Sequence, residues 1–106
     1  MAKQRQSRIP LHERSLERGP LAAVVLGRRE QLGLRQEELA DLAGCSARFV
    51  HELENGKETV QLDKVLSVLA ALGLHLQVAD GVAPGVAADG TLRASMGLDA
   101  GAPEQP

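Results

Sequence analysis

The stretch Leu34–Lys57, LRQEELADLAGCSARFVHELENGK, contains two short helical patterns separated by a glycine. In the first pattern, residues 36–43, three apolar residues recur at helical spacing: Leu39, Ala40 and Ala43. This spacing predicts a helix with one buried stripe. Gly44 follows directly, and a glycine at this place can adopt the left-handed conformation that ends a helix. The sequence therefore predicts a helix that stops at a tight turn.

A second helix is predicted directly after this turn. Ser46 can cap its first turn, and Gly56 can end it. Val50 and Leu53 are expected to point inward, while the remaining residues share the outer side: Ala47, Arg48, His51 and Glu52. Two helices joined by a short turn that contains glycine form a helix-turn-helix, whose second helix enters the DNA major groove. The alternative is an ordinary helical hairpin, in which these residues serve only the core and the turn.

Further helices are predicted on both sides of the motif. The first opens at Gly19-Pro20, where a proline in the first turn loses no helical hydrogen bond, and ends at Gly33. Residues 61–72 carry the strongest amphipathic pattern of the chain: Leu62, Val65, Leu66, Leu69 and Leu72. These two helices are expected to close a core around the motif.

The segments QEELA, AGCS and ELENGK, in this order, closely resemble the helix-turn-helix of the Xre and lambdoid-phage repressor family. Over about residues 20–79, including KETVQLDKVL, the chain resembles the HipB-type antitoxins within that family. This resemblance implies a four-helix domain that ends in a strand pairing between subunits. The resemblance to the phage repressors implies a partly buried ion pair between Arg29 and Glu54, for which the alternative is two solvated charges.

The segment LHLQV, residues 74–78, alternates apolar and polar residues and predicts a short half-buried strand. A lone strand needs a partner, and a second copy of the chain across a twofold axis is the simplest one. The expected fold class is therefore all-α, a compact four-helix bundle of the lambda-repressor-like DNA-binding type with a short C-terminal β-strand pairing across a dimer.

Charge and composition divide the chain into three expected segments. Residues 1–19 form a flexible basic arm, with five cations against two acids, and residues 20–79 form the DNA-binding and dimerisation domain. Residues 80–106 are rich in Gly, Ala and Pro and are expected to be a disordered tail. The whole chain carries a net charge of −2, but the arm alone carries +3. The arm is expected either to contact DNA, on the phosphates or in a minor groove, or to be a solvated leader.

Several classes of function are disfavoured by the residues. One cysteine excludes an internal disulfide and a cysteine-based metal cluster, and no histidine is spaced to form a catalytic triad. We therefore expect no enzyme activity, no cofactor and no metal. No run of 18 apolar residues occurs, so the expected protein has no membrane partner and is cytoplasmic, associated with the bacterial nucleoid when bound to DNA.

The resemblance assigns base-reading positions to the second motif helix. They fall at Ala47, Arg48 and Glu52, with His51 nearby. Arg48 is the strongest candidate, because a guanidinium can bond O6 and N7 of guanine together. Ala47 can meet a thymine methyl group, and Glu52 can accept from N4 of cytosine.

Other residues are candidates for contacts with the DNA backbone. Gln36 matches the family's phosphate-contacting glutamine at a helix N-terminus, where N–H groups already favour an anion. Arg35 weakens the helix cap but adds a cation, and Ser46 and Lys57 are further phosphate candidates, with a solvated charge as the alternative for Lys57. Phe49 is expected to pack either on DNA sugar or on the domain.

These features together predict a sequence-specific DNA-binding transcriptional repressor that acts as a homodimer on a palindromic operator. The HipB resemblance implies the antitoxin of a type II toxin–antitoxin system, which represses its own operon and binds a HipA-like kinase toxin. The alternatives are a solitary Xre-type repressor and a protein-binding adaptor on the same fold.

Overall fold

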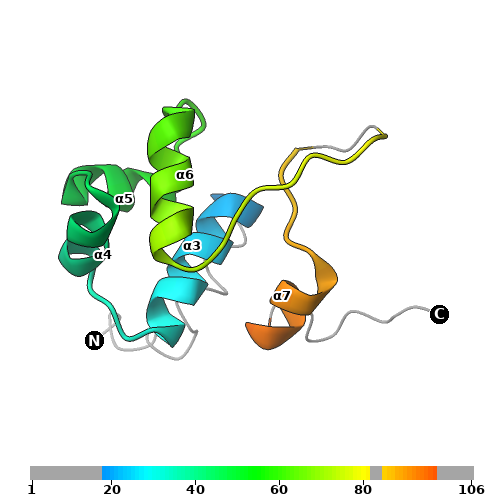
Figure 1. Ribbon diagram of the computed structural model, residues 1–106, viewed down its shortest axis with the longest axis horizontal. Coiled ribbons are helices and arrows are strands. Elements are labelled where there is room, and N and C mark those ends of the chain that lie inside the picture. Colours follow the sequence, from blue (N-terminus) through cyan, green and yellow to red (C-terminus); the bar gives the residue numbers. More distant parts are fainter. Residues whose placement is uncertain (1–17, 82–84, 98–106) are drawn as a thin grey trace, which may run out of the picture.

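The computed structural model describes residues 18–81 and 85–97, which form five α-helices and no strand. The helices are α3 (Pro20–Gln31), α4 (Gln36–Ala43), α5 (Ala47–Glu54), α6 (Leu62–Ala71) and α7 (Gly90–Ser95). Figure 1 shows α3 to α6 gathered together, with α7 set apart from them at the end of an extended segment. The fold is therefore all-α in the described residues.

The core lies where α3, α4, α5 and α6 meet. Helix α4 packs against both α5 and α6, and α3 packs against α5. The buried cluster between them is aliphatic, as expected of a chain with one Phe and no Trp or Tyr: Val25, Leu39, Ala40, Val50, Leu53, Val65, Val68, Leu69 and Leu72. Each buried Leu or Val side chain contributes roughly 1.5–3 kcal/mol by leaving water, so this cluster fixes how the helices sit.

The turn between α4 and α5 has the predicted form. Gly44 adopts a left-handed conformation with φ of 74°, which a side chain would disfavour. The Cys45 N–H then donates to the Ala40 carbonyl at 3.0 Å, which satisfies one of the free carbonyls at the helix end. The chain can therefore reverse within three residues and start α5.

Gly56 has a second role that the sequence did not reveal. It ends α5 with a φ of 84°, and a Cβ atom placed on it would lie 2.5 Å from the Arg18 carbonyl oxygen. The backbone that leads into α3 therefore passes directly against the end of α5. Any side chain at position 56 would be strained in its own conformation and would also push these two segments apart.

The predicted strand at residues 74–78 is wrong. The described residues contain no strand, and this segment runs as an exposed extended chain away from α6 (Figure 1). Leu74 is still held by a hydrogen bond from its N–H to the Leu69 carbonyl, but Leu76 and Val78 are exposed. Leu74 packs against the core cluster, but the described residues contain no second strand that could pair with this segment.

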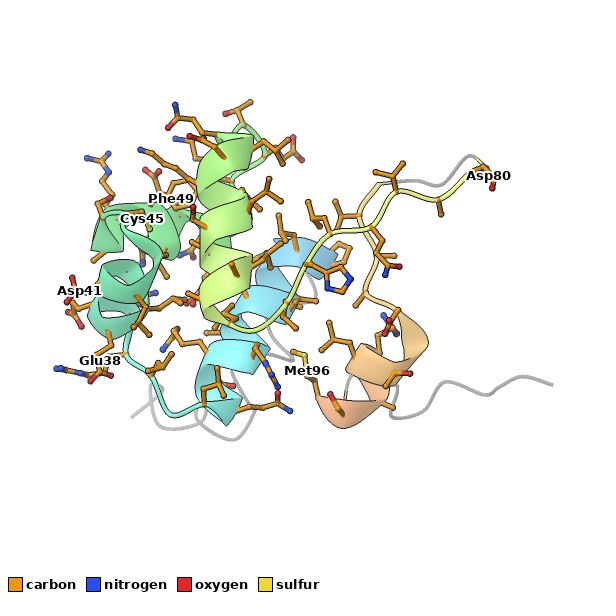
Figure 2. The ribbon with its side chains drawn as sticks, in the orientation of Figure 1. Glu38, Asp41, Cys45, Phe49, Asp80 and Met96 are labelled. Atoms are coloured by element: carbon orange, nitrogen blue, oxygen red, sulfur yellow. The ribbon has the colours of Figure 1, made fainter. Side chains whose placement is uncertain are left out.

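The expected four-helix bundle is also corrected, because α7 is a further helix that the pattern did not indicate. Asp89 caps it by accepting from the Leu92 N–H at 2.8 Å. Its C-terminus lies beside α3, where Gln31 Nε2 donates to the Ser95 carbonyl at 2.9 Å. Met96, which is only 5% exposed, lies at the end of α7 nearest to α3 (Figure 2).

The division into three segments remains a prediction. The basic arm lies almost wholly outside the described residues, which begin at residue 18. The segment 80–106 contains α7, and its residues 82–84 and 98–106 also lie outside the described part.

Replacing Met96 by serine should release α7 without unfolding the core. Met96 is buried but does not belong to the central cluster, so we expect a local opening rather than global unfolding. Trypsin should then cleave after Arg93 several-fold faster, while the melting temperature changes little. Ala94→Ser, at an exposed position of the same helix, is the matched control. An unchanged cleavage rate in the Met96 variant would show that Met96 does not hold α7.

Candidate nucleic-acid interface

Helix α5 begins at a formed cap. Ser46 Oγ accepts from the Phe49 N–H at 3.0 Å, which confirms that Ser46 caps this helix. Val50 and Leu53 are buried in the core, whereas Arg48 and His51 are exposed on the opposite side. The helix is therefore held by its apolar face and presents its polar face outward.

Ser46→Ala should lower the free energy of unfolding by about 1 kcal/mol, because the Phe49 N–H loses its partner. Urea denaturation followed by circular dichroism measures this change. Ser67→Ala is a suitable control, since Ser67 is exposed within α6 and bonds only the Asp63 carbonyl of its own helix. A loss as large for Ser67→Ala as for Ser46→Ala would show that the cap contributes nothing specific.

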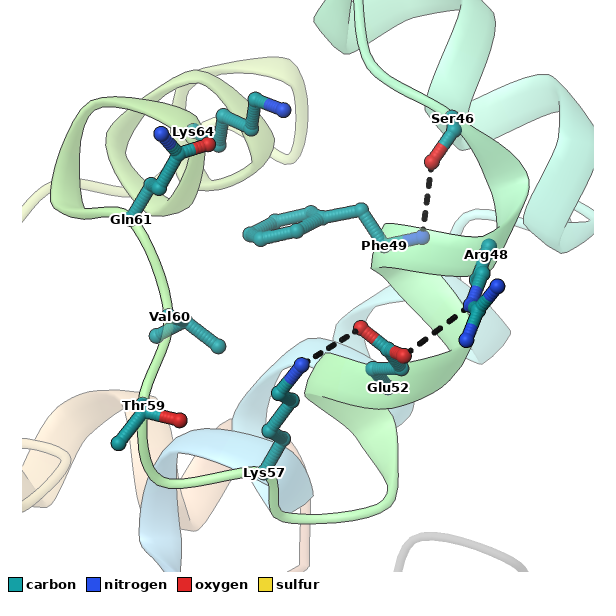
Figure 3. A pocket seen from close by; sticks show the side chains of 9 residues that line it. All are labelled: Ser46, Arg48, Phe49, Glu52, Lys57, Thr59, Val60, Gln61 and Lys64. Atoms are coloured by element: carbon teal, nitrogen blue, oxygen red, sulfur yellow. Dashed lines mark hydrogen bonds and ion pairs between the residues drawn. The ribbon is translucent and has the colours of Figure 1, made fainter.

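Arg48 and Glu52 form an ion pair on the outer face of α5. The Arg48 side chain is 86% exposed, and its Nε donates to Glu52 Oε2 at 3.2 Å. Lys57 Nζ, from the loop after the helix, donates to Glu52 Oε1 at 3.3 Å (Figure 3). The hydrogen bond from Arg48, and next that from Lys57, lowers the pKa of Glu52. The carboxylate is therefore ionised at neutral pH.

Ala47, the third predicted base reader, and the neighbouring candidate His51 are placed differently. Ala47 is half-buried and packs against the core, so only part of its surface faces outward. His51 is exposed, and its carbonyl accepts from Asn55 Nδ2 at 2.7 Å. The Asn55 amide also lies 3.3 Å from His51 Nε2, which sets the ring beside the end of the helix.

Gln36 is turned inward rather than toward the outside. Its Nε2 donates to Glu54 Oε1 at 2.9 Å, so the amide group is engaged within the protein. Arg35 is exposed at the N-cap of α4, where its side chain makes no capping hydrogen bond. Instead, Glu38 Oε1 accepts from the Arg35 N–H at 2.8 Å. Arginine has no acceptor atom, so only this half of a capping box forms.

Glu54 is a buried carboxylate that joins three helices. It is only 3% exposed, and Arg29 donates to it twice, from Nε at 2.6 Å and from Nη2 at 2.9 Å. The predicted ion pair between Arg29 and Glu54 is therefore confirmed. The bond to Glu54 raises the pKa of Arg29. Gln36 supplies a third donor to Glu54, which sequence reasoning missed because it assigned this amide to DNA.

An open hollow of about 250 Å³ lies between α5, the following loop and α6 (Figure 3). Phe49 extends into this region, packs against the core cluster and has Lys64 Nζ 5.8 Å from its ring centre. The partly buried ring thus packs on the domain in this structure, and a contact between Phe49 and DNA sugar stays a prediction. Four predicted site residues line the hollow: Ser46, Arg48, Glu52 and Lys57. The other lining residues are Phe49, Thr59, Val60, Gln61 and Lys64.

Lys64 is the main missed residue of this surface. It lies in the first turn of α6, exposed, and joins Arg48 and Lys57 around the same hollow. Its place depends on the path of the loop between α5 and α6, which no local pattern specifies. Three cations around one carboxylate give this surface a net positive charge although the whole chain is slightly acidic.

No group of three or more metal-ligating side chains is found among the described residues. Burial raises the pKa of the Cys45 thiol, so it lacks the character of an activated nucleophile. Within residues 18–81 and 85–97, no helix has the length and apolar character needed to cross a membrane.

The arrangement of α4, the glycine turn and α5 agrees with a comparison to known families. The sequence model of the family described as "Helix-turn-helix domain" matches residues 21–80, which is more than half of the chain. The chain belongs to this helix-turn-helix family. In its terms, α4 is the first helix of the motif and α5 is the recognition helix.

Two relatives share this helix-turn-helix. The chain is 48% identical over 64 residues to the uncharacterized HTH-type transcriptional regulator y4mF of Sinorhizobium fredii. That alignment covers 60% of this chain and 79% of the relative. The chain is also 36% identical to an uncharacterized HTH-type transcriptional regulator of Haemophilus influenzae, in an alignment of 50 residues that covers 47% of this chain. That alignment spans about half of the Haemophilus protein, 51%. The expected helix-turn-helix family is thereby confirmed, and the narrower HipB-like subfamily remains a prediction.

Proposed function

We propose that this protein is a sequence-specific DNA-binding regulator of transcription and that α5 enters the major groove. The observation that carries the proposal is the exposed Arg48 guanidinium on the outward face of a capped recognition helix. Its relatives carry names of HTH-type transcriptional regulators, which supports the same class. Repression is the simplest regulatory outcome, because a protein seated in the groove blocks access to the promoter.

Phosphate contacts are proposed for the residues around the reading face. Lys57 and Lys64 flank Arg48 at the hollow, and Arg35 is an exposed cation at the start of α4. Ser46 lies at the N-terminus of α5, where backbone N–H groups favour an anion. Such contacts hold the domain on the duplex without selecting a sequence. For Gln36 we propose a smaller part, since its amide already bonds Glu54.

We further propose that the protein binds as a homodimer. One domain supplies only a few phosphate contacts, and two linked copies on adjacent half-sites bind far more tightly than one, because the second copy binds at a high effective concentration. The operator would then be a pseudo-palindrome with half-sites about 10 base pairs apart, one turn of the double helix. The described residues do not specify the interface between copies.

The finer proposal is that of an antitoxin. It rests on the resemblance of residues 20–79 to HipB-type antitoxins and would give the protein a HipA-like kinase toxin as partner and its own operon as target. A solitary Xre-type repressor is the competing proposal, and the names of the two relatives, HTH-type transcriptional regulators, fit both. Co-purification of the full chain with the product of a neighbouring reading frame decides between them. Recovery of a stoichiometric kinase complex supports the antitoxin, and its absence supports the solitary regulator.

The proposed DNA binding is tested with the full chain and duplexes that tile the promoter of its own gene. Fluorescence anisotropy should show one duplex bound about 10³-fold or more tightly than random DNA of equal length. Affinity should fall steeply as salt rises, because phosphate contacts release counterions. A folded protein that binds no duplex would overturn the proposal and favour a protein-binding adaptor. Equal affinity for all duplexes would overturn sequence specificity.

A further inference from the structure

The geometry points to Glu52 as a positioning residue that holds the Arg48 guanidinium ready for a base, rather than as a reader of cytosine. This inference rests on the proposed DNA binding and names the device that gives it sequence preference. It replaces a role that the position of Glu52 alone suggested. The evidence is the way in which the two carboxylate oxygens and the guanidinium are occupied.

Both oxygens of Glu52 already accept hydrogen bonds within the protein. Oε2 accepts from Arg48 Nε at 3.2 Å, and Oε1 accepts from Lys57 Nζ at 3.3 Å. The Glu52 side chain is 28% exposed, against 86% for Arg48, so Arg48 projects beyond it. Each oxygen keeps a further lone pair, so the two bonds do not by themselves block cytosine N4. Because Arg48 is far more exposed than Glu52, however, a base that approaches this face meets the guanidinium before the carboxylate.

The hydrogen bond to Glu52 uses the Nε atom of Arg48 and leaves the terminal nitrogens of the guanidinium for a base. Only Nε of Arg48 is engaged with Glu52, and the described residues supply no hydrogen-bond partner for Nη1 or Nη2. The edge formed by these two nitrogens is planar and can donate to guanine O6 and N7 together. A long side chain normally loses rotamer freedom when it is fixed in a groove. The bond to Glu52 fixes part of Arg48 in advance and so lowers that cost.

Lys57 completes the arrangement from the other side. It follows α5 in the loop, and its bond to Oε1 holds the carboxylate between two cations (Figure 3). These neighbours lower the pKa of Glu52, so the carboxylate keeps its charge at neutral pH. The paired cations also offset the repulsion between this carboxylate and DNA phosphates. Glu52 can therefore lie at the DNA-facing surface while its own charge is largely compensated.

The test is selection from a pool of random-sequence duplexes by the full chain and its variants. Glu52→Ala should weaken the preference at the base pair read by Arg48 by about threefold or more, the size expected for a coupled pair. Affinity for the unselected pool should stay the same or rise, because a negative charge has gone. Glu52→Gln keeps an oxygen that can accept from Nε, so it should retain part of the preference. Circular dichroism verifies that each variant is folded.

A double-variant cycle separates positioning from direct reading. In an Arg48→Ala background, Glu52→Ala should cause no further change in base preference, because there is no guanidinium to position. If Glu52 reads cytosine itself, the second change will still alter the preference, at a different base pair. That result overturns the inference while leaving the proposed function in place.

Two controls complete the experiment. Glu58→Ala removes the same charge from an exposed carboxylate close in sequence, and should leave the base preference unchanged. A similar loss of preference for Glu58→Ala and Glu52→Ala would show a general charge effect and overturn the positioning role. If the wild-type chain enriches no sequence, the proposed function fails and this inference fails with it. If the wild type enriches a sequence and Glu52→Ala enriches it equally, only the inference fails.

Discussion

Glu54→Ala should lower the free energy of unfolding by about 3–5 kcal/mol, the range for removing one partner of a buried ion pair. Glu54 is 3% exposed, and its loss removes the main acceptor of the Arg29 guanidinium and the acceptor that the described residues provide for Gln36 Nε2. Small domains have stabilities near the lower end of about 5–15 kcal/mol, so much of the variant should be unfolded at physiological temperature. Urea denaturation followed by circular dichroism gives the value.

A matched substitution isolates the effect of burial. Glu58→Ala removes the same charge at an exposed position and should change stability by no more than about 0.5 kcal/mol. A double variant, Arg29→Met with Glu54→Leu, should recover part of the loss, since neither charge then remains buried alone. If Glu54→Ala lowers the free energy of unfolding by less than about 1 kcal/mol, the Arg29–Glu54 pair contributes no more than a surface ion pair and does not hold α3 to α5.

Arg48→Ala is expected to have the largest effect on DNA binding while leaving the fold intact. Losing a bidentate base contact should weaken binding to the selected operator by about 1–3 kcal/mol and relax the preference at one base pair in each half-site. Stability should stay near that of the wild type, because the side chain is exposed and lies outside the core cluster. Anisotropy titrations on operator and random duplexes measure both effects.

Lys64→Gln gives the contrasting behaviour. Lys64 lies across the hollow from Arg48 and is placed to meet phosphate, so its loss should weaken operator and random DNA alike and reduce the salt dependence. Equal losses on both duplexes for Arg48→Ala would instead assign Arg48 to the backbone. The reading role would then pass to another residue of α5.

The helix-turn-helix could be predicted because the residues that end its first helix and start its second lie close together in the sequence. Gly44 and Ser46 determine the end of one helix and the start of the next, and the predicted range 36–43 coincides with α4. The pattern over 61–72 likewise agrees with α6 to within one residue at each end. Buried spacing and capping act over a few residues, so a sequence displays them directly.

Features that depend on distant partners could not be predicted in this way. The alternation at 74–78 gives a strand only if another strand is present to pair with it, and the described residues contain none. Helix α7 is six residues long, too short for a helical period to emerge, and its contact with α3 depends on Gln31 and Met96.

The candidate site likewise contains features that follow from residues close in sequence and features that depend on distant partners. Arg48 and Glu52 are four residues apart on one helix, so their pairing follows from spacing alone. The inward turn of Gln36 depends on the buried Glu54 of another helix, and the place of Lys64 depends on the loop before α6. Residue type indicated which side chains suit DNA, but only the packed helices show which of them are already engaged.

The two faces of α5 have consequences for how such a regulator can evolve. Val50, Leu53 and Glu54 anchor the helix, while Arg48 and His51 contribute nothing to the buried cluster. Substitutions on the outer face are therefore nearly neutral for stability and can accumulate without loss of the fold. A duplicated gene can drift toward a new operator through these few codons, and a library randomised at the same positions should yield folded members with altered targets.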